Sequence, residues 1–194
     1  MDALLHRIRE NGLDSKRYGL EELLGEGGYS LVFAHPDPAL AVKATTCSVS
    51  TALLTQLMAE PRDDFVRVHG KHELGGLGPA AAVTAFLVER LDWPAKQAYQ
   101  GFSEAVQSAA QFALAGATRP PKRGTAEYIA FNVRYCEGLA AADPARAAAW
   151  AFLASFVKGQ TNPRLSVDVL TEGNLLARNG MLVLSDPVRQ VWLP

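Results

Sequence analysis

Residues 165–188 read LSVDVLTEGNLLARNGMLVLSDPV, and this stretch decides how the rest of the chain is interpreted. A polar loop from Ser166 to Gly173 leads into two short apolar runs, Asn174 to Ala177 and Met181 to Leu184. Asn179-Gly180 separates the two runs, and Asn-Gly in this setting is a strong signal for a tight hairpin. The sequence therefore predicts a two-stranded hairpin followed by Ser-Asp-Pro.

This hairpin would place candidate metal ligands at one of its ends. Asn174 enters the first predicted strand and Asp186 leaves the second, while Asp168 and Glu172 lie in the preceding loop. Amide and carboxylate oxygens are the ligands that a hard cation such as Mg2+ prefers. Two interpretations stay open from these residues alone: a Mg2+ site, or a surface hairpin with ordinary turn residues.

Length and composition describe a globular protein of one domain or two small lobes. The chain has 194 residues, 48% of them hydrophobic and 20% charged, which is enough to bury a substantial core. Its 19 Lys and Arg nearly balance 20 Asp and Glu. Net charge therefore gives no reason to expect direct binding to nucleic acid or to an anionic membrane.

Cysteine usage and the N-terminal residues favour a cytoplasmic protein. Cys47 and Cys136 are the two cysteines of the sequence; they form no zinc motif and fit a reducing compartment. The first residues, MDALLHRIRENG, carry charges throughout, unlike a signal peptide. Since no apolar run approaches the roughly 20 residues of a membrane span, we expect no membrane association.

A glycine-rich segment in the first half, Gly25 to Phe33, lies between two apolar runs. Glycines let a backbone fold over a ligand and point N–H groups at phosphate oxygens. Because a strand and not a helix follows, the pattern excludes a dinucleotide-binding fingerprint and a Walker A loop. The alternative is a glycine-rich hairpin without a ligand.

Lys43 closes the next predicted strand, Ala39 to Lys43, whose other residues are apolar. Buried lysines are rare unless they are paired, and this lysine would lie beside the glycine-rich segment. The alternative is a lysine that extends along the strand end and keeps its ammonium group in water.

The remaining elements follow from periodicity and from helix start and stop signals. Asp143 and Pro144 suit the N-cap and the first position of a helix running to about Lys158, and Glu73 to Pro79 is rich in turn residues. The basic cluster Arg119, Lys122 and Arg123 is interpreted as a solvated loop, and the alternative is a substrate-docking site. The other predicted elements are strands at 18–24, 64–69 and 82–89 and helices at 2–11, 49–59, 101–116 and 124–140.

These motifs resemble those of protein kinases. Gly25-x-Gly27-x-x-Ser30-x-Val32, followed by Ala41-Val42-Lys43, is similar to the kinase glycine-rich loop and third-strand lysine. Glu89-Arg90-Leu91 resembles the hinge that faces adenine. The resemblance implies an α+β, protein kinase-like fold with a β-rich N-lobe, residues 1–90, and a reduced helical C-lobe, residues 91–194.

The resemblance also implies roles for individual residues. Lys43 would hold the α- and β-phosphates of ATP, and Asp186 and Asn174 would hold Mg2+. Asp168 would orient the attacking hydroxyl and accept its proton. The residues expected around the nucleotide are Gly25, Gly27, Gly28, Ser30, Val32, Ala41, Lys43, Glu89 and Leu91.

Several positions depart from the kinase pattern. In H-R-D-x-x-x-x-N the Asp lies five residues before the Asn; here Val169 has that place, and Asp168 lies one residue earlier. Either the loop contains one extra residue or the catalytic position is lost. No glutamate lies within 49–59 to pair with Lys43, and the sequence ends eight residues after Asp186, so we expect no activation loop and a truncated C-lobe.

The combined pattern VDVLTEGN, ARNG and LVLSDP is similar to the minimal protein kinases of T7-like bacteriophages. This resemblance implies an ATP- and Mg2+-dependent Ser/Thr kinase that acts on host proteins in the cytoplasm of an infected bacterium. One alternative is a pseudokinase or binding module that inhibits or scaffolds a host protein. Another is a small-molecule phosphotransferase related to the aminoglycoside kinases, which would need a larger helical lobe.

Overall fold

The computed structural model describes residues 22–76, 82–160, 164–169, 171 and 173–190. The chain divides into two compact units, residues 1–91 and 92–194. Within the residues that the structure describes, unit 1 has one antiparallel sheet and a helix, and unit 2 has three α-helices and four short strands. The predicted α+β class is confirmed. No helix among the described residues is both long and apolar enough to span a bilayer.

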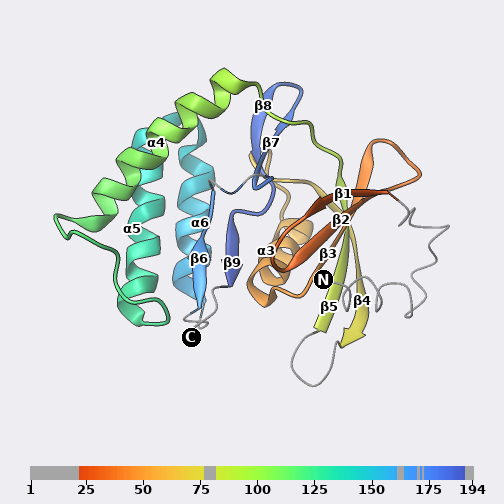
Figure 1. Ribbon diagram of the computed structural model, residues 1–194, viewed down its shortest axis with the longest axis horizontal. Coiled ribbons are helices and arrows are strands. Elements are labelled where there is room, and N and C mark those ends of the chain that lie inside the picture. The colour runs from red at the N-terminus through yellow and green to blue at the C-terminus, as the bar shows by residue number, and fades with distance from the viewer. Residues whose placement is uncertain (1–21, 77–81, 161–163, 170, 172, 191–194) are drawn as a thin grey trace. The chain divides into compact units, whose positions relative to one another are not determined.

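Unit 1 is built on a five-stranded sheet of order β1-β2-β3-β5-β4, in which every neighbouring pair is antiparallel (Figure 1). Alternate residues of these strands, with one leucine from β4, form a buried cluster: Leu31, Phe33, Val42, Ala44, Leu74, Val83 and Ala85. Successive side chains of a strand point to opposite faces of the sheet, so alternate residues face the same core. The strands are β1 (Leu23–Glu26), β2 (Ser30–Ala34), β3 (Leu40–Thr45), β4 (Val68–Gly76) and β5 (Ala82–Glu89).

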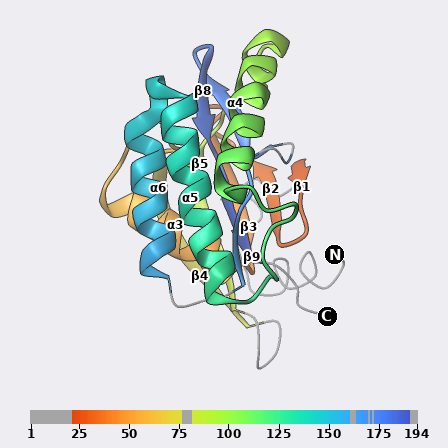
Figure 2. The same cartoon turned by 90° about the vertical axis from the view of Figure 1, so that its left-hand side faces the viewer.

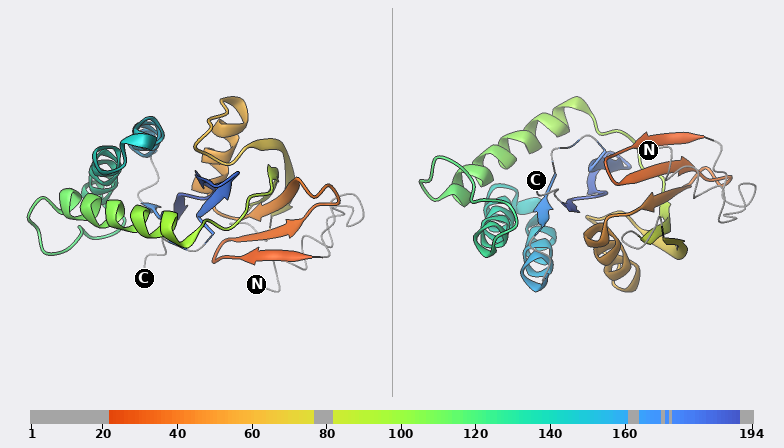
Figure 3. Two further views of the ribbon diagram at one scale, coloured as in Figure 1. Left: turned by 90° about the horizontal axis from the view of Figure 1, so that it is seen from above. Right: turned by 60° about the horizontal axis from the view of Figure 1, so that its bottom comes forward.

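Helix α3 (Ser48–Ala59) connects β3 to β4 and packs beside β4 (Figure 3). Its buried face consists of Val49, Leu53, Leu54 and Leu57, together with Ser50. Cys47 caps the helix, since its Sγ accepts a hydrogen bond from the Ser50 N–H at 3.4 Å. Glu60 is the C-cap, and Pro61 restricts that residue to non-helical backbone. The predicted helix at 49–59 is confirmed.

Unit 2 begins with three helices, α4 (Lys96–Leu114), α5 (Ala126–Ala142) and α6 (Ala147–Gly159), of which α5 packs against both others (Figure 2). Gly138 on α5 lies against the backbone of Ala109 on α4, and a Cβ at position 138 would stand 3.0 Å from the Ala109 Cα. Small residues let the two helices approach closely at this point.

Two pairs of short strands complete unit 2. β6 (Leu165–Val167) pairs antiparallel with β9 (Val188–Gln190), and β7 (Leu175–Arg178) pairs antiparallel with β8 (Met181–Leu184). Asn179 and Gly180 join β7 to β8 with φ of 51° and 81°. Two consecutive residues of positive φ are the signature of a type I′ turn, so the predicted hairpin is confirmed.

Some predicted boundaries are wrong in unit 1. The strand expected at 64–69 begins only at Val68 and continues to Gly76, through most of the segment read as a turn. The glycine and turn residues of this segment suggested a turn and not a strand. They fit into a strand because its pairing with β5 contains two register shifts. Lys43 does not close its strand, since β3 continues to Thr45. Gly25 and Glu26 belong to β1 and not to the turn.

The helix boundaries in unit 2 also differ from those predicted. The helix expected at 101–116 spans Lys96–Leu114, and the one at 124–140 spans Ala126–Ala142. Asp143 and Pro144 open a 3-10 turn, Pro144–Arg146, before α6 begins. Asp143 does not cap with its side chain; its Oδ2 accepts from the Arg146 Nε at 2.7 Å and the Trp150 Nε1 at 2.9 Å.

The predicted helix at 2–11, the first residues of the strand at 18–24, and Glu172 lie outside the described residues.

The close approach of α4 and α5 predicts opposite effects of alanine at two helical glycines. Gly101→Ala, on an open part of α4, should raise the free energy of unfolding by about 0.5–1 kcal/mol through helix propensity. Gly138→Ala should lower it by about 1 kcal/mol, because the new Cβ crowds Ala109 and Phe112. Urea unfolding of both variants measures this, and an equal gain in both would contradict the packing argument.

Candidate functional site

Three hydrogen bonds tie the loop after β6 to the β7–β8 hairpin. The Asn174 Nδ2 donates to the Asp168 carbonyl at 2.7 Å, and the Ser185 N–H donates to the Asn174 carbonyl at 2.9 Å. The Asp168 N–H donates to the Pro187 carbonyl at 2.8 Å. Ser185 and Pro187 flank Asp186 in the chain, so the structure brings Asp168, Asn174 and Asp186 to the same end of the hairpin.

Strand register explains this convergence. Leu175 pairs with Leu184, which places Asn174 opposite Ser185 as the hairpin begins and ends. Val167 pairs with Val188, which places Asp168 opposite Pro187. Gly173 has a φ of 85°, a conformation that glycine adopts without strain, and it turns the chain into Asn174. The Ser185 hydroxyl closes the end by donating to the Gly173 carbonyl.

The Asp168 carboxylate has two side-chain partners. The Thr171 hydroxyl lies 2.7 Å from Oδ1 and 2.6 Å from Oδ2, and the Thr171 N–H lies 3.3 Å from Oδ1. The Arg189 Nη1 lies 3.1 Å from Oδ2. The Asp168 side chain is 12% exposed, so a small part of it is open to solvent.

Two residues of this loop bear on the departure from the kinase spacing. Val169, which holds the place five residues before Asn174, is an apolar side chain of 1% exposure. The side chain of Asp168, one residue earlier, is 12% exposed, and its carbonyl accepts from the Asn174 Nδ2. The polar side chain at this turn therefore belongs to Asp168, and Val169 is buried.

Helix α5 positions β6 through a buried amide. Asn132, 1% exposed, accepts from the Val167 N–H through Oδ1 at 2.9 Å and donates through Nδ2 to the Tyr128 carbonyl at 2.7 Å. The Tyr128 hydroxyl shares a hydrogen bond with the Ser166 Oγ at 3.0 Å. These bonds fix the two residues immediately before Asp168. Sequence analysis missed Asn132, Tyr128, Thr171 and Arg189.

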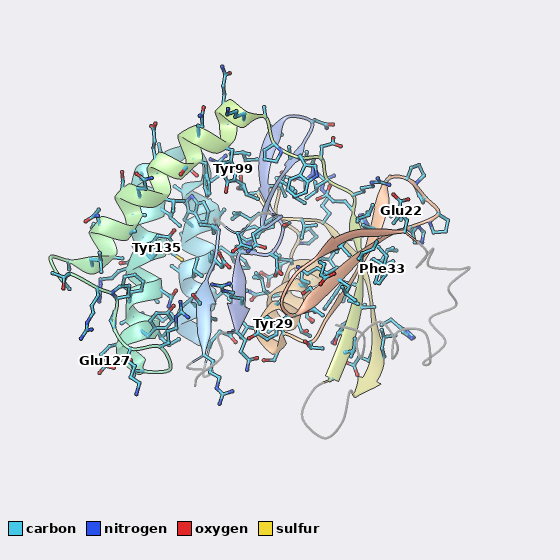
Figure 4. The ribbon with its side chains drawn as sticks, viewed as in Figure 1. Glu22, Tyr29, Phe33, Tyr99, Glu127 and Tyr135 are labelled. Carbon is cyan, nitrogen blue, oxygen red and sulfur yellow. The ribbon has the colours of Figure 1, made fainter. Side chains whose placement is uncertain are left out.

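Tyr135 and Cys136 lie on α5 (Figure 4 labels Tyr135). Burial raises the pKa of the Tyr135 phenol well above its ordinary value, and the negative charges of Cys136 and Asp168 add to the rise. Burial, with a smaller contribution from Glu137, raises the pKa of Cys136 to about 12. Both side chains are therefore neutral near pH 7, and neither is activated as a nucleophile.

In unit 1, Lys43 lies on the central strand β3. It is 6% exposed, and its register neighbours are Val32 on β2 and Phe86 on β5. Ala41, two residues earlier, is 3% exposed. A lysine buried to this degree within a sheet is unusual, so the burial that the sequence suggested for Lys43 is present.

The turn between β1 and β2 is anchored to β3. The Gly27 N–H donates to the Ser30 carbonyl at 2.9 Å, and the Thr46 N–H donates to the Tyr29 carbonyl at 2.9 Å. The Ser30 hydroxyl donates to the Thr45 Oγ1 at 2.9 Å. Ser30 thus holds the end of the turn to the strand that carries Lys43.

The three glycines of this segment are not required by the backbone or by packing. None of them has a positive φ. A Cβ would meet nothing within 4 Å at Gly25 or Gly28, and at Gly27 it would stand 3.9 Å from the Ser30 carbonyl. Alanine would therefore fit at all three positions, so neither backbone conformation nor packing explains the three glycines.

The segment predicted to face adenine is partly occupied within unit 1. The Glu89 N–H donates to the Arg67 carbonyl at 3.0 Å, and its carboxylate accepts from the Arg67 N–H at 2.7 Å. The Arg90 N–H donates to the Ala39 carbonyl at 2.8 Å. The third backbone N–H of the segment from Glu89 to Leu91 is that of Leu91, and the hydrogen bonds just described do not involve it.

The hairpin end offers oxygen ligands for a cation. Because the Asn174 Nδ2 donates to Asp168, the Asn174 Oδ1 is the amide atom that could coordinate an ion. The described residues contain no group of three or more His, Cys, Asp or Glu suited to a metal. The oxygen donors at this end of the hairpin are the Asn174 amide and the carboxylates of Asp168 and Asp186.

A scan against protein-family models finds none that matches this chain, and a search of curated proteins finds no match either.

The buried amide of Asn132 predicts a measurable stability effect. Asn132→Ala leaves the Val167 N–H without its partner and should lower the free energy of unfolding by about 2 kcal/mol. Gln107→Ala, which removes an exposed amide from α4, should change it by less than about 0.5 kcal/mol. Urea unfolding compares the two. Equal effects would show that Asn132 does not hold β6.

Proposed function

We propose that this protein is an ATP- and Mg2+-dependent Ser/Thr protein kinase with a compact protein kinase-like fold. The observation that carries the proposal is the hydrogen-bonded convergence of Asp168, Asn174 and Asp186 at one end of the β7–β8 hairpin. Phosphoryl transfer needs a carboxylate for the acceptor hydroxyl and oxygen ligands for the metal, held in fixed relation. This end of the hairpin supplies both kinds of group.

The residues of unit 1 support the same proposal. A glycine-rich turn, whose glycines neither conformation nor packing requires, is anchored to the strand that carries Lys43. The turn from Gly25 to Ser30 would cover the phosphate groups, although its Gly27 N–H donates to the Ser30 carbonyl, and Lys43 would neutralise the phosphate charge. The Leu91 N–H would bind adenine, and Val32 of β2 and Ala41 of β3 would lie around the nucleotide.

In the proposed reaction the γ-phosphoryl group leaves ATP and bonds to a serine or threonine hydroxyl, and ADP is released. Asp168 accepts the hydroxyl proton, which requires that one of its oxygens exchange the Thr171 hydroxyl for the acceptor. Arg189 holds the other side of the carboxylate. Bound Mg2+ would neutralise the phosphate charge, with Asn174 and Asp186 as its ligands.

By the resemblance of its sequence, we place the enzyme in the cytoplasm of a phage-infected bacterium, with a host protein as substrate. The balanced charge of the chain, 19 basic against 20 acidic residues, supports a protein partner rather than nucleic acid.

A second candidate function is that of a pseudokinase, which binds ATP and inhibits or scaffolds a host protein without phosphoryl transfer. The observation that favours it is the occupation of the Asp168 carboxylate by Thr171 and Arg189. A carboxylate that already contacts a hydroxyl and a guanidinium must release one of these partners before it can bind an acceptor hydroxyl.

A transfer assay distinguishes the two candidates. The protein is incubated with labelled ATP, Mg2+ and bacterial lysate, and label in protein is measured. Asp168→Asn removes the proton acceptor and should reduce transfer by about 100-fold or more, with ATP-dependent thermal stabilisation retained. Lys43→Met should reduce both. Asp63→Asn, at a carboxylate that is 91% exposed and pairs with Arg67, should change neither.

Each result of this assay has one meaning. Transfer that survives Asp168→Asn unchanged rules out the assigned proton acceptor. Stabilisation by ATP without transfer in the unaltered protein supports the pseudokinase. If Mg2+ and ATP raise the melting temperature of no form of the protein, nucleotide binding itself is refuted.

The open space at the loop glycines predicts a separation of stability from ligand binding. Gly27→Ala and Gly28→Ala should leave the free energy of unfolding unchanged or raise it by about 0.5 kcal/mol, since the chain accommodates a Cβ there. The same variants should weaken the thermal stabilisation by ATP, because a Cβ hinders close approach of phosphate to the backbone. Thermal unfolding with and without nucleotide tests both, and unchanged stabilisation would remove the phosphate-binding role of this turn.

A further inference from the structure

A cavity of about 830 Å³ lies in unit 2 at the end of α4 and beside α5. The connection between these helices, which Figure 1 shows as a long loop, forms one wall, and Phe131 and Arg134 of α5 form another. Arg119 and Lys122 come from the loop. The cavity shares no residue with the site around Asp168.

Three cationic side chains line this cavity, and none of the described residues that line it is acidic. Arg119 and Lys122 are exposed, whereas Arg134 is half-buried. The Arg134 Nε donates to the Ala113 carbonyl at 3.3 Å, so one side of its guanidinium is held while the terminal amines stay available. Sequence analysis interpreted Arg119, Lys122 and Arg123 as a solvated loop, and it missed the contribution of Arg134 from the helix.

The walls of the cavity are apolar and stiff. Phe131 stacks between Tyr128 and Tyr135 on α5, with ring centroids 6.0 Å and 6.4 Å apart. Pro120 and Pro121 form part of the loop wall, and proline restricts the backbone of such a loop. The cavity is therefore largely formed before a ligand arrives, which lowers the entropy cost of binding.

We propose that this cavity binds a short acidic segment of a partner protein, with glutamate or aspartate side chains against the three cations and an apolar side chain against Phe131. Its volume falls within the range of ligand sites, and a single small anion would fill only a minor part of it. A nucleic acid needs more phosphate contacts than three cations provide. The inference goes beyond the proposed kinase, because binding here requires neither ATP nor transfer.

Fluorescence anisotropy without nucleotide tests the proposal. The probe is a labelled peptide of about eight residues with alternating glutamates around a leucine, compared with the same peptide carrying glutamine for glutamate. The glutamate peptide should bind at least about 10-fold more tightly at low salt and weaken as salt rises. The double variant Arg119→Gln, Lys122→Gln should weaken it about 5-fold or more.

Arg123→Gln is the matched control, since Arg123 is an exposed cation of the same loop outside the cavity lining. It should bind the peptide as the unaltered protein does. Equal affinity for the two peptides, or equal effects of the control and the double variant, would overturn the proposal. Displacement of the peptide by inorganic phosphate or by a single-stranded oligonucleotide at a lower concentration than by unlabelled peptide would also overturn it.

Discussion

The buried hydrogen bond between the Asn132 amide and the Val167 N–H is the interaction on which the candidate site depends. A buried backbone N–H must be paired, and β6 is only three residues long, with β9 as its partner strand. The side chain of Asn132 supplies a further partner from α5, whose packing against α4 and α6 makes it the rigid centre of unit 2. The position of Asp168 follows, because it is the next residue along the chain.

A series of hydrogen bonds connects Asp168 to the rest of the site. Asp168 bonds Pro187, Asn174 bonds Asp168, and Ser185 bonds Asn174. The Asn174 side chain and main-chain groups of Asp168, Ser185 and Pro187 therefore hold this end of the hairpin together.

Local signals predicted much of the fold. Asn179-Gly180 predicted the hairpin because two positive φ values in succession admit few residue types, and apolar spacing predicted α3. The strand β4 was missed because its glycines suggest a turn, and pairing with β5 overrides that tendency. Asp143 was assigned to a helix cap, whereas its carboxylate accepts hydrogen bonds from Arg146 and Trp150 instead.

The sequence by itself predicted the hairpin and the candidates Lys43, Asp168, Asn174 and Asp186, and its resemblance to kinases predicted the α+β class. It could do so because each depends on neighbours within a few positions. Only the tertiary structure decided that Arg189 contacts the Asp168 carboxylate, that Asn132 supports β6, and that Arg134 joins the loop cations. Those contacts depend on strand register and helix packing between distant segments, and no local pattern in one sequence records them.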